Sequence, residues 1–250
     1  MKTLTLTVKE MPAVGLEAET IKPESVAGKK MGDVAALIVY AGKRKLKLGD
    51  VFELKGELAK EAGEQAIVVE KSTAKLKRIG EAMGAGEITV KGDVGYHLGE
   101  FMCGGKITVE GNAGSWVGTN MEGGEIVITG NAGSYVGCSA RGVHDGMKAG
   151  RITVKGNVGT EVGVGLAGGE ITVEGRVEDF CGSYMRGGII RVGGTGQRPS
   201  YAMSGGEIVI SDRGYRPPLY FTKSSEDNEY ALYEGDSSFG GKGKLRIKKK

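Results

Sequence analysis

Few side chains in this 250-residue chain are of the types that bind metals or act as nucleophiles. The cysteines are Cys103, Cys138 and Cys181, with no CxxC pair, and the histidines are His97 and His144. Within the repeat described below, the cysteines fall at three different offsets, so they neither share a side nor stack. We therefore expect no catalytic residue, no metal site and no bound cofactor in this chain.

The charged side chains are nearly balanced, with 34 Lys and Arg against 31 Asp and Glu. Positions such as Lys91, Glu110, Lys155 and Glu174 are scattered beside short strands, whereas a polysaccharide-cleaving site needs clustered carboxylates. We interpret them as a solvated face with ion pairs between neighbouring repeats. The basic end, KGKLRIKKK at 242–250, is one short cluster on a chain of net charge +3. We expect no nucleic-acid partner.

The cellular compartment is predicted from what the sequence lacks. The opening MKTLTLTVKE has no apolar run of the length a signal peptide requires. No segment approaches 18 continuous apolar residues, so we expect no membrane contact. An odd number of cysteines without close pairs fits a reducing cytoplasm, where we place the protein.

The elements that must position these side chains come from a repeat of 19 residues. Each copy begins with an apolar–x–apolar strand, such as ITV at 107–109 and IVI at 126–128, and ends near a methionine or leucine that we expect in the core. The third copy carries seven additional residues. The copies open at Gly86, Gly105, Gly124, Gly150, Gly169, Gly188 and Gly206.

Glycines recur within each copy as GxxGxxxG, between the short strands. Glycine adopts positive φ without a Cβ clash, so we predict that these residues form sharp corners. The predicted corner glycines are Gly92, Gly95, Gly99, Gly111, Gly114, Gly118, Gly130, Gly133, Gly137, Gly156, Gly159 and Gly163.

Identical short strands in tandem stack best in register on the next copy. A period of 19 is not divisible by six, which argues against a left-handed hexapeptide helix. The sequence therefore predicts an all-β fold, a right-handed parallel β-helix, or solenoid, of about seven 19-residue coils. Residues 1–65 would be an N-terminal capping region, 66–212 the β-helix, and 213–250 an irregular C-terminal tail with a basic end.

Two features suggest contacts with other proteins. One is a row at the same offset in successive copies, which we expect to face outward because Glu161 belongs to it; it could equally be stacking that shields the corners. The other is the insertion CSARGVHDGMKAG at 138–150, which could equally be a tolerated bulge. The candidate contact residues are His97, Trp116, Tyr135 and Phe180 in the row, and Arg141, His144 and Asp145 in the insertion.

The glycine repeats, with GNAG at 111–114 and 130–133, resemble the GXGXG domain. That domain is shared by the C subunit of formylmethanofuran dehydrogenase, the C subunit of the methylotroph formyltransferase/hydrolase complex, and the C-terminal domain of the glutamate synthase large subunit. The N-terminal stretch IKPESVAGKKMGDVAALIVYAGKRKLKLGDVFELKGE at 21–57 and the insertion RGVHDGMKAG are similar to the dehydrogenase subunit. Glu178 departs from the glycine pattern.

The resemblance implies a non-catalytic structural or assembly subunit of formylmethanofuran dehydrogenase. In that family, the complex reduces CO2 and fixes it as formylmethanofuran in the first step of methanogenesis. The tungsto- or molybdopterin, the iron–sulfur clusters and a metal-dependent hydrolase site belong to partner subunits. Two alternatives stay open: a stand-alone glutamate synthase GXGXG domain, and a polysaccharide-active β-helix.

Overall fold

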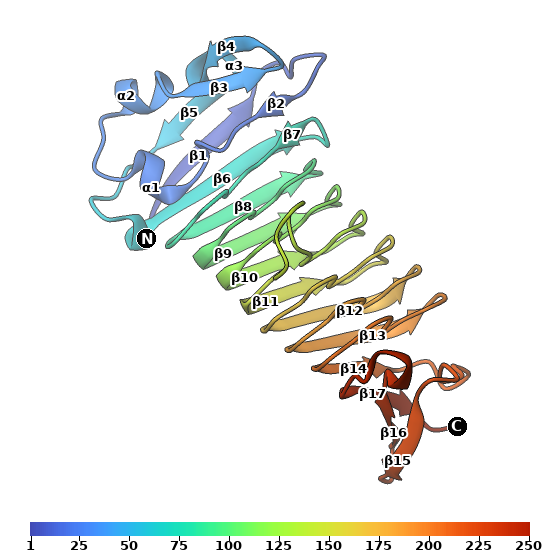
Figure 1. Ribbon diagram of the computed structural model, residues 1–250. Coiled ribbons are helices and arrows are strands. Elements are labelled where there is room, and N and C mark those ends of the chain that lie inside the picture. The colour runs from blue at the N-terminus through green and yellow to red at the C-terminus, as the bar shows by residue number, and fades with distance from the viewer.

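The computed structural model describes residues 1–250, and two sheets account for most of it (Figure 1). The larger sheet has 13 strands in the order β15-β16-β17-β14-β13-β12-β11-β10-β9-β8-β6-β1-β5. The smaller one has four, in the order β4-β3-β2-β7. The helices are short, and none is long and apolar enough to cross a membrane.

The N-terminal region supplies both sheets. Strand β1 (Lys2–Val8) lies between β5 (Phe52–Gly56), to which it is antiparallel, and β6 (Gln65–Ser72), to which it is parallel. The remaining elements are β2 (Leu16–Glu17), α1 (Pro23–Val26), α2 (Met31–Ala35), β3 (Ile38–Ala41), β4 (Arg44–Lys47), α3 (Leu48–Val51), η1 (Ala62–Glu64) and β7 (Leu76–Lys77).

The repeats supply the parallel centre of the large sheet. Its strands are β8 (Glu87–Gly92), β9 (Cys103–Glu110), β10 (Glu122–Ile128), β11 (Ala149–Val154), β12 (Glu170–Val177), β13 (Ile189–Thr195) and β14 (Glu207–Ile210). Equivalent residues are direct neighbours, so that Ile126 pairs with Ile107 on one side and Ile152 on the other. This in-register pairing is what the 19-residue period predicts.

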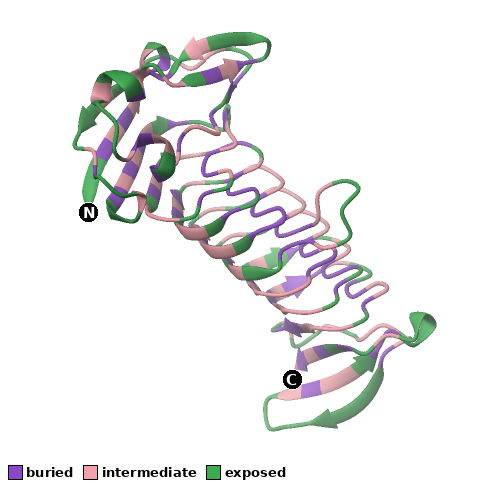
Figure 2. Ribbon diagram, turned by 60° about the vertical axis from the view of Figure 1, so that its left-hand side comes forward, coloured by how far each residue is buried: buried purple, intermediate pink, exposed green.

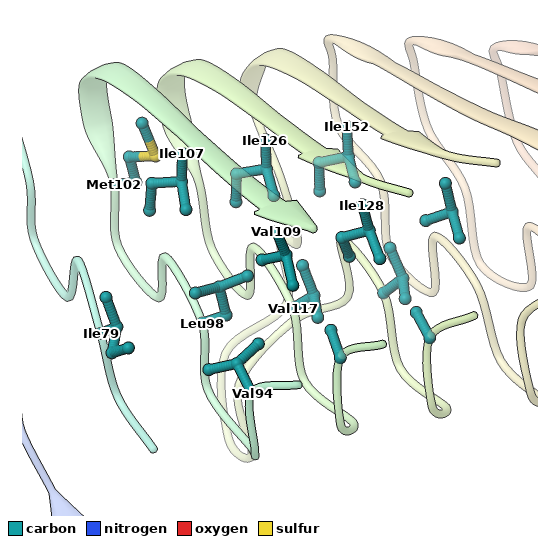
Figure 3. Packing of buried hydrophobic residues seen from close by; sticks show 14 of the residues in the cluster. Ile79, Val94, Leu98, Met102, Ile107, Val109, Val117, Ile126, Ile128 and Ile152 are labelled. Atoms are coloured by element: carbon teal, nitrogen blue, oxygen red, sulfur yellow. The ribbon is translucent and has the colours of Figure 1, made fainter. Parts of the chain in front are cut away.

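The core lies behind this sheet and runs through the length of the molecule (Figure 2). Alternation in each strand directs the two apolar residues inward, as Ile107 and Val109 show in Figure 3. Leu98 and Met102 approach them from the loop side, and both are fully buried. The methionines that end each copy are therefore part of the core, where flexible side chains fill gaps between the isoleucine rows.

On the side away from the sheet, successive copies are joined by single bridges and by an amide ladder. Isolated parallel bridges link Val94, Ala113, Ala132, Val158 and Val177 in turn. Beside them, each Asx side chain accepts a hydrogen bond from the backbone of the next copy. These bonds run from Asn112 N to Asp93 Oδ1 (2.8 Å), Asn131 N to Asn112 Oδ1 (2.9 Å), Asn157 N to Asn131 Oδ1 (2.7 Å) and Arg176 N to Asn157 Oδ1 (2.8 Å).

We expect Asn131→Ala to lower the free energy of unfolding by about 1 kcal/mol, because it removes one such bond. Asn131→Asp should retain stability to within about 0.5 kcal/mol, since a carboxylate oxygen accepts the same bond at Asp93. Denaturant unfolding of the two variants measures the difference. Equal loss in both variants would contradict a role for the acceptor oxygen.

The C-terminal segment is not irregular, because it adds three strands to the large sheet. Strand β17 (Gly243–Lys248) pairs in parallel with β14, and β16 (Tyr230–Gly235) and β15 (Thr222–Glu226) follow in antiparallel order. A short helix, η2 (Ser237–Phe239), precedes β17. Much of the basic end is neutralised within the chain by ion pairs from Arg246 to Glu207, Lys248 to Glu229 and Lys249 to Glu226.

The predicted fold class, a right-handed parallel β-helix of about seven coils, is corrected by this topology. The strands form one mixed 13-stranded sheet with antiparallel pairs at both ends, and no solenoid or closed barrel. Outside that sheet the copies meet through single bridges and through backbone hydrogen bonds such as Gly118 N to Leu98 O. The physical reason is that every second residue beyond the bridge has positive φ, as at His97, Gly99 and Phe101, and such residues cannot continue a strand.

The predicted division at 1–65, 66–212 and 213–250 stays a prediction. Strands from all three ranges belong to the same 13-stranded sheet.

Candidate interaction face

The structure brings the predicted row of aromatic residues together as a stack. The rings of Trp116 and Tyr135 are nearly parallel, with centroids 4.2 Å apart, and His97 lies 6.0 Å from Trp116 on the other side. The Tyr135 hydroxyl donates a 3.3 Å hydrogen bond to Glu161, whose nearby charge raises the pKa of that hydroxyl. Phe180 continues the row and carries Arg198 over its ring at 5.8 Å.

All five residues of this row have left-handed backbone, with φ between 61° and 68°. Bulky L-residues rarely adopt that conformation, and each costs on the order of 1 kcal/mol or more. The geometry is held by bonds between copies, such as Trp116 N to Ser134 O (2.9 Å). Glycine would relieve the strain at these positions, so large half-buried side chains there are a feature that points to a role in contacts.

Four residues further along each copy lies a second row, which was not predicted from the sequence. Phe101 and Tyr184 have φ of 57° and 56°, and their side chains are 46% and 52% exposed. Tyr201 packs edge-on against Tyr184, and Phe239 packs edge-on against Tyr201. The sequence contains a signal for this second row. Phe101 follows His97 by four residues, and Tyr184 follows Phe180 by four. We call the two rows together the aromatic face.

The insertion projects as an exposed loop from the middle of the repeats (Figure 2), and side chains of neighbouring copies hold it. Asn120, from the second row, donates to the carbonyl of Asp145 (2.6 Å) and accepts from the amide of Ala140 (2.7 Å). Arg186 forms an ion pair with the Asp145 carboxylate and donates to the His144 carbonyl at 2.9 Å.

These bonds involve two of the three candidate residues in the insertion, His144 and Asp145. Asp145 and the His144 carbonyl anchor the loop, whereas Arg141 and Val143 at its tip are exposed. The side chains left free for a partner are therefore at 141–144.

A pocket of about 170 Å³ opens in the C-terminal half of the aromatic face. It connects the two rows, because Glu161 and Phe180 come from the first and Tyr184 from the second. The lining residues are Glu161, Val164, Phe180, Ser183, Tyr184 and Tyr201. Its mixture of aromatic rings and one carboxylate can hold a side chain of another protein.

At the N-terminal end of the face, a charge cluster lies beneath His97. The Glu100 carboxylate is nine-tenths buried, 3.0 Å from His97 Nδ1 and 3.4 Å from the Arg78 guanidinium. Arg78 is also bonded to Glu81 at 2.7 Å, and this bond raises the pKa of the guanidinium. The Arg78 guanidinium compensates the charge of the buried Glu100 carboxylate, and His97 lies beside that carboxylate at the end of the stack.

The outer face of the large sheet has a different character. It carries ion pairs between neighbouring strands, for example Lys91 to Glu70 (3.2 Å) and Lys106 to Glu125 (2.9 Å). Such exposed pairs contribute little stability, about 0–1 kcal/mol each. The scattered residues Lys91, Glu110, Lys155 and Glu174 are all exposed, and of these Lys91 forms an ion pair with a neighbouring strand. The aromatic face is the better candidate for contacts.

The cysteines remain apart. Cys138 and Cys181 are buried free thiols, and burial raises the pKa of each to about 12, whereas Cys103 is exposed. No three His, Cys, Asp or Glu side chains gather as a metal centre would require.

The structure places the predicted corner glycines in two groups. Gly92, Gly99, Gly118, Gly137 and Gly163 have positive φ. The other seven do not. There the absence of a side chain matters because the backbone of the preceding copy is close: a Cβ on Gly111 would lie 2.5 Å from the carbonyl oxygen of Gly92.

The glycine pattern is shared with known proteins. The model of the GXGXG motif matches residues 64–220. The chain belongs to the GXGXG family. The matched range contains the whole stack of the aromatic face, the insertion and all of the parallel strands from β6 to β14.

Curated relatives of this GXGXG chain are subunits of formylmethanofuran dehydrogenase. The C subunit of the tungsten-containing enzyme 2 from Methanothermobacter marburgensis is 45% identical over 98 residues, which are 39% of this chain and 36% of that protein. The C subunit of the molybdenum-containing enzyme 1 from Methanosarcina barkeri is 42% identical over 98 residues, 39% of this chain and 33% of that protein. The matched part thus spans about a third of these relatives.

A solved structure extends the likeness to nearly the whole chain. A chain of the formyltransferase/hydrolase complex from Methylorubrum extorquens, solved with methylofuran, superposes with a TM-score of 0.89 at 29% identity. The match covers 98% of this chain and all of the other. The N- and C-terminal parts outside the GXGXG range therefore belong to the shared architecture.

Proposed function

We propose that this GXGXG chain is a non-catalytic structural and assembly subunit of a cytoplasmic formylmethanofuran dehydrogenase complex. In this proposal the complex reduces CO2 and fixes it as formylmethanofuran in the first step of methanogenesis. The tungsto- or molybdopterin, the iron–sulfur clusters and the metal-dependent hydrolase site lie in partner subunits.

The observation that carries the proposal is the likeness, over 98% of the chain, to a chain of a formyltransferase/hydrolase complex built from several subunits. The names of the curated relatives support the dehydrogenase assignment, since the tungsten and molybdenum enzymes each contain a relative of this chain.

The shape of the molecule supports a structural role. A sheet in which each strand pairs with a copy of itself is stiff along its length, so side chains on its loops keep fixed spacings. The aromatic face presents Trp116 and tyrosine side chains, and the tip of the insertion presents Arg141; these are the types that dominate the energy of protein interfaces. We assign the contacts with partner subunits to this face and to the tip of the insertion.

The test is purification of the tagged chain from its native cells. We expect it to elute with partner subunits, tungsten or molybdenum, and formylmethanofuran-forming activity. A chain that elutes without these, and whose fractions form glutamate from glutamine or hydrolyse a polysaccharide, would overturn the proposal and support one of the alternative functions.

A further inference from the structure

A basic hairpin stands at the N-terminal end of the molecule (Figure 1). Strands β3 and β4 form it, joined by a two-residue turn in which Gly42 has φ 61°. This matches the type II′ turn that keeps hairpins compact. Strand β4 is the end strand of the four-stranded sheet, so one of its sides has no partner.

The unpaired side of β4 offers backbone groups as well as side chains. The Leu48 amide donates to the carbonyl of Leu37 at 2.7 Å, so these two residues form a hydrogen-bonded pair. Hydrogen-bonded and non-hydrogen-bonded pairs alternate along the antiparallel strands β3 and β4. Lys45 then lies at a position whose amide and carbonyl point away from β3. The neighbouring amide of Lys47 is already bonded to Asp50 at 2.8 Å.

The hairpin carries positive charge that no ion pair neutralises. Lys43, Arg44, Lys45 and Lys47 are all exposed, and none forms an ion pair, although ion pairs are frequent on the large sheet. Residues 1–80 hold 15 Lys and Arg against 11 Asp and Glu, whereas residues 81–250 hold 19 against 20. The excess positive charge of the chain is therefore located in this end.

An apolar groove of about 390 Å³ runs along the same hairpin. Met11, Val14 and Leu46 line it, and the Val14 side chain is 71% exposed. Arg44 lines it beside Leu46, so a cation borders the apolar surface. Two carboxylates, Glu10 and Asp50, also line the groove, and Asp50 is occupied by the Lys47 amide.

We propose that an extended acidic segment of a partner protein docks along β4. Its carboxylates would pair with the cations at 43–47, its apolar side chains would enter the groove, and its backbone would bond to Lys45. This inference rests on the proposed function, because it gives the chemistry of one partner in the assembled complex.

Two alternative roles for the hairpin account for less of what is observed. Lysine on an edge strand prevents like chains from pairing, but that role requires no exposed apolar groove beside it. Nucleic acid would be attracted by the same charge, but phosphate contacts do not use apolar surface.

The experiment is carbodiimide cross-linking of the purified native complex, which joins a lysine amine to a carboxylate in direct contact. We expect amide links from Lys43, Lys45 or Lys47 to Asp or Glu residues of a partner polypeptide. The ion pairs Lys91–Glu70 and Lys106–Glu125 supply internal controls, because both should link within the chain.

A matched pair of variants measures the effect on assembly. Replacing both Lys43 and Lys45 by Glu should weaken retention of the partner in a salt titration by at least about tenfold. Replacing both Lys29 and Lys30 by Glu changes the charge equally on another exposed segment and should change retention less than about twofold. A 20-base-pair DNA duplex serves as the competing probe.

The outcomes separate the two proposals. An intact complex in which the hairpin lysines carry no cross-link to a partner overturns this inference alone. The same holds if the partner is retained equally well by the Lys43/Lys45 variant and by the Lys29/Lys30 variant. Binding of the duplex that is lost on charge reversal, without any protein link, would assign the hairpin to nucleic acid instead. A chain that purifies without partners overturns the proposed function and this inference together.

Discussion

Gly111→Ala is expected to lower the free energy of unfolding by about 2–3 kcal/mol, because a single methyl group has no space there. The new Cβ would lie 2.5 Å from the carbonyl oxygen and 2.6 Å from the carbonyl carbon of Gly92, and 2.9 Å from Asp93 Oδ1. These are backbone and ladder atoms that cannot rotate away. For a chain of this size, the melting temperature should fall by roughly 4–12 °C.

The matched control is Gly63→Ala. Gly63 is exposed in η1, has no positive φ, and a Cβ there would meet nothing within 4 Å. Its melting temperature should stay within about 2 °C of the parent, since surface substitutions change stability little. Equal melting temperatures for the two variants would contradict the close packing of copies on which the fold depends.

Trp116→Ala is expected to weaken binding of the partner subunits by about 30-fold or more, equivalent to about 2 kcal/mol. Trp116 is the only tryptophan in the chain, and it lies at the centre of the stack between His97 and Tyr135. Its removal leaves a gap that a partner surface complementary to the aromatic face would not fill. The dissociation constant of the variant with the remaining purified complex measures this effect.

Two controls separate loss of contact from loss of fold. Trp116→Phe retains a ring on the stack and should lose less than half of that binding energy. Thr108→Ala lies on the outer face of β9, opposite in character to the aromatic face, and should bind as the parent does. Binding that is unchanged in Trp116→Ala would show that the partner contacts lie elsewhere.

The pairing of the strands followed from the sequence because it depends on local chemistry repeated at fixed spacing. Ile107 and Ile126 become neighbours since each copy presents the same apolar–x–apolar segment to the next. The architecture was harder to predict from the sequence. Whether the segments outside the sheet form strands depends on their backbone φ angles, and the residue types at 97 and 116 do not indicate that His and Trp adopt left-handed backbone.

The C-terminal segment shows a second limit. It lacks the 19-residue repeat, so its strands had no internal template to reveal them. The pairing of β17 with β14 is decided by burial of Leu245 and Ile247 against the end of the core, which is a tertiary property. Arg246 and Lys248 therefore belong to a strand, and their charges meet acids of the same chain.

One row of the aromatic face was predicted from the sequence, and the other was not. The stacked row appears in the sequence because its members share one offset, and stacking follows once the copies are in register. Phe101 and Tyr184 share another offset, but only their exposure distinguishes them from core residues. The anchoring of the insertion by Asn120 and Arg186 required the fold itself, since these residues come from different copies.

Hydroxyl-radical footprinting of the free chain and of the native complex tests most directly whether this protein is a scaffold held through its aromatic face. The account predicts that oxidation of Phe101, Trp116 and Tyr184 falls several-fold in the complex, whereas side chains on the outer face of β9 and β10 react equally in both. Unchanged reactivity at those three aromatic residues, with protection of the sheet face instead, would contradict it.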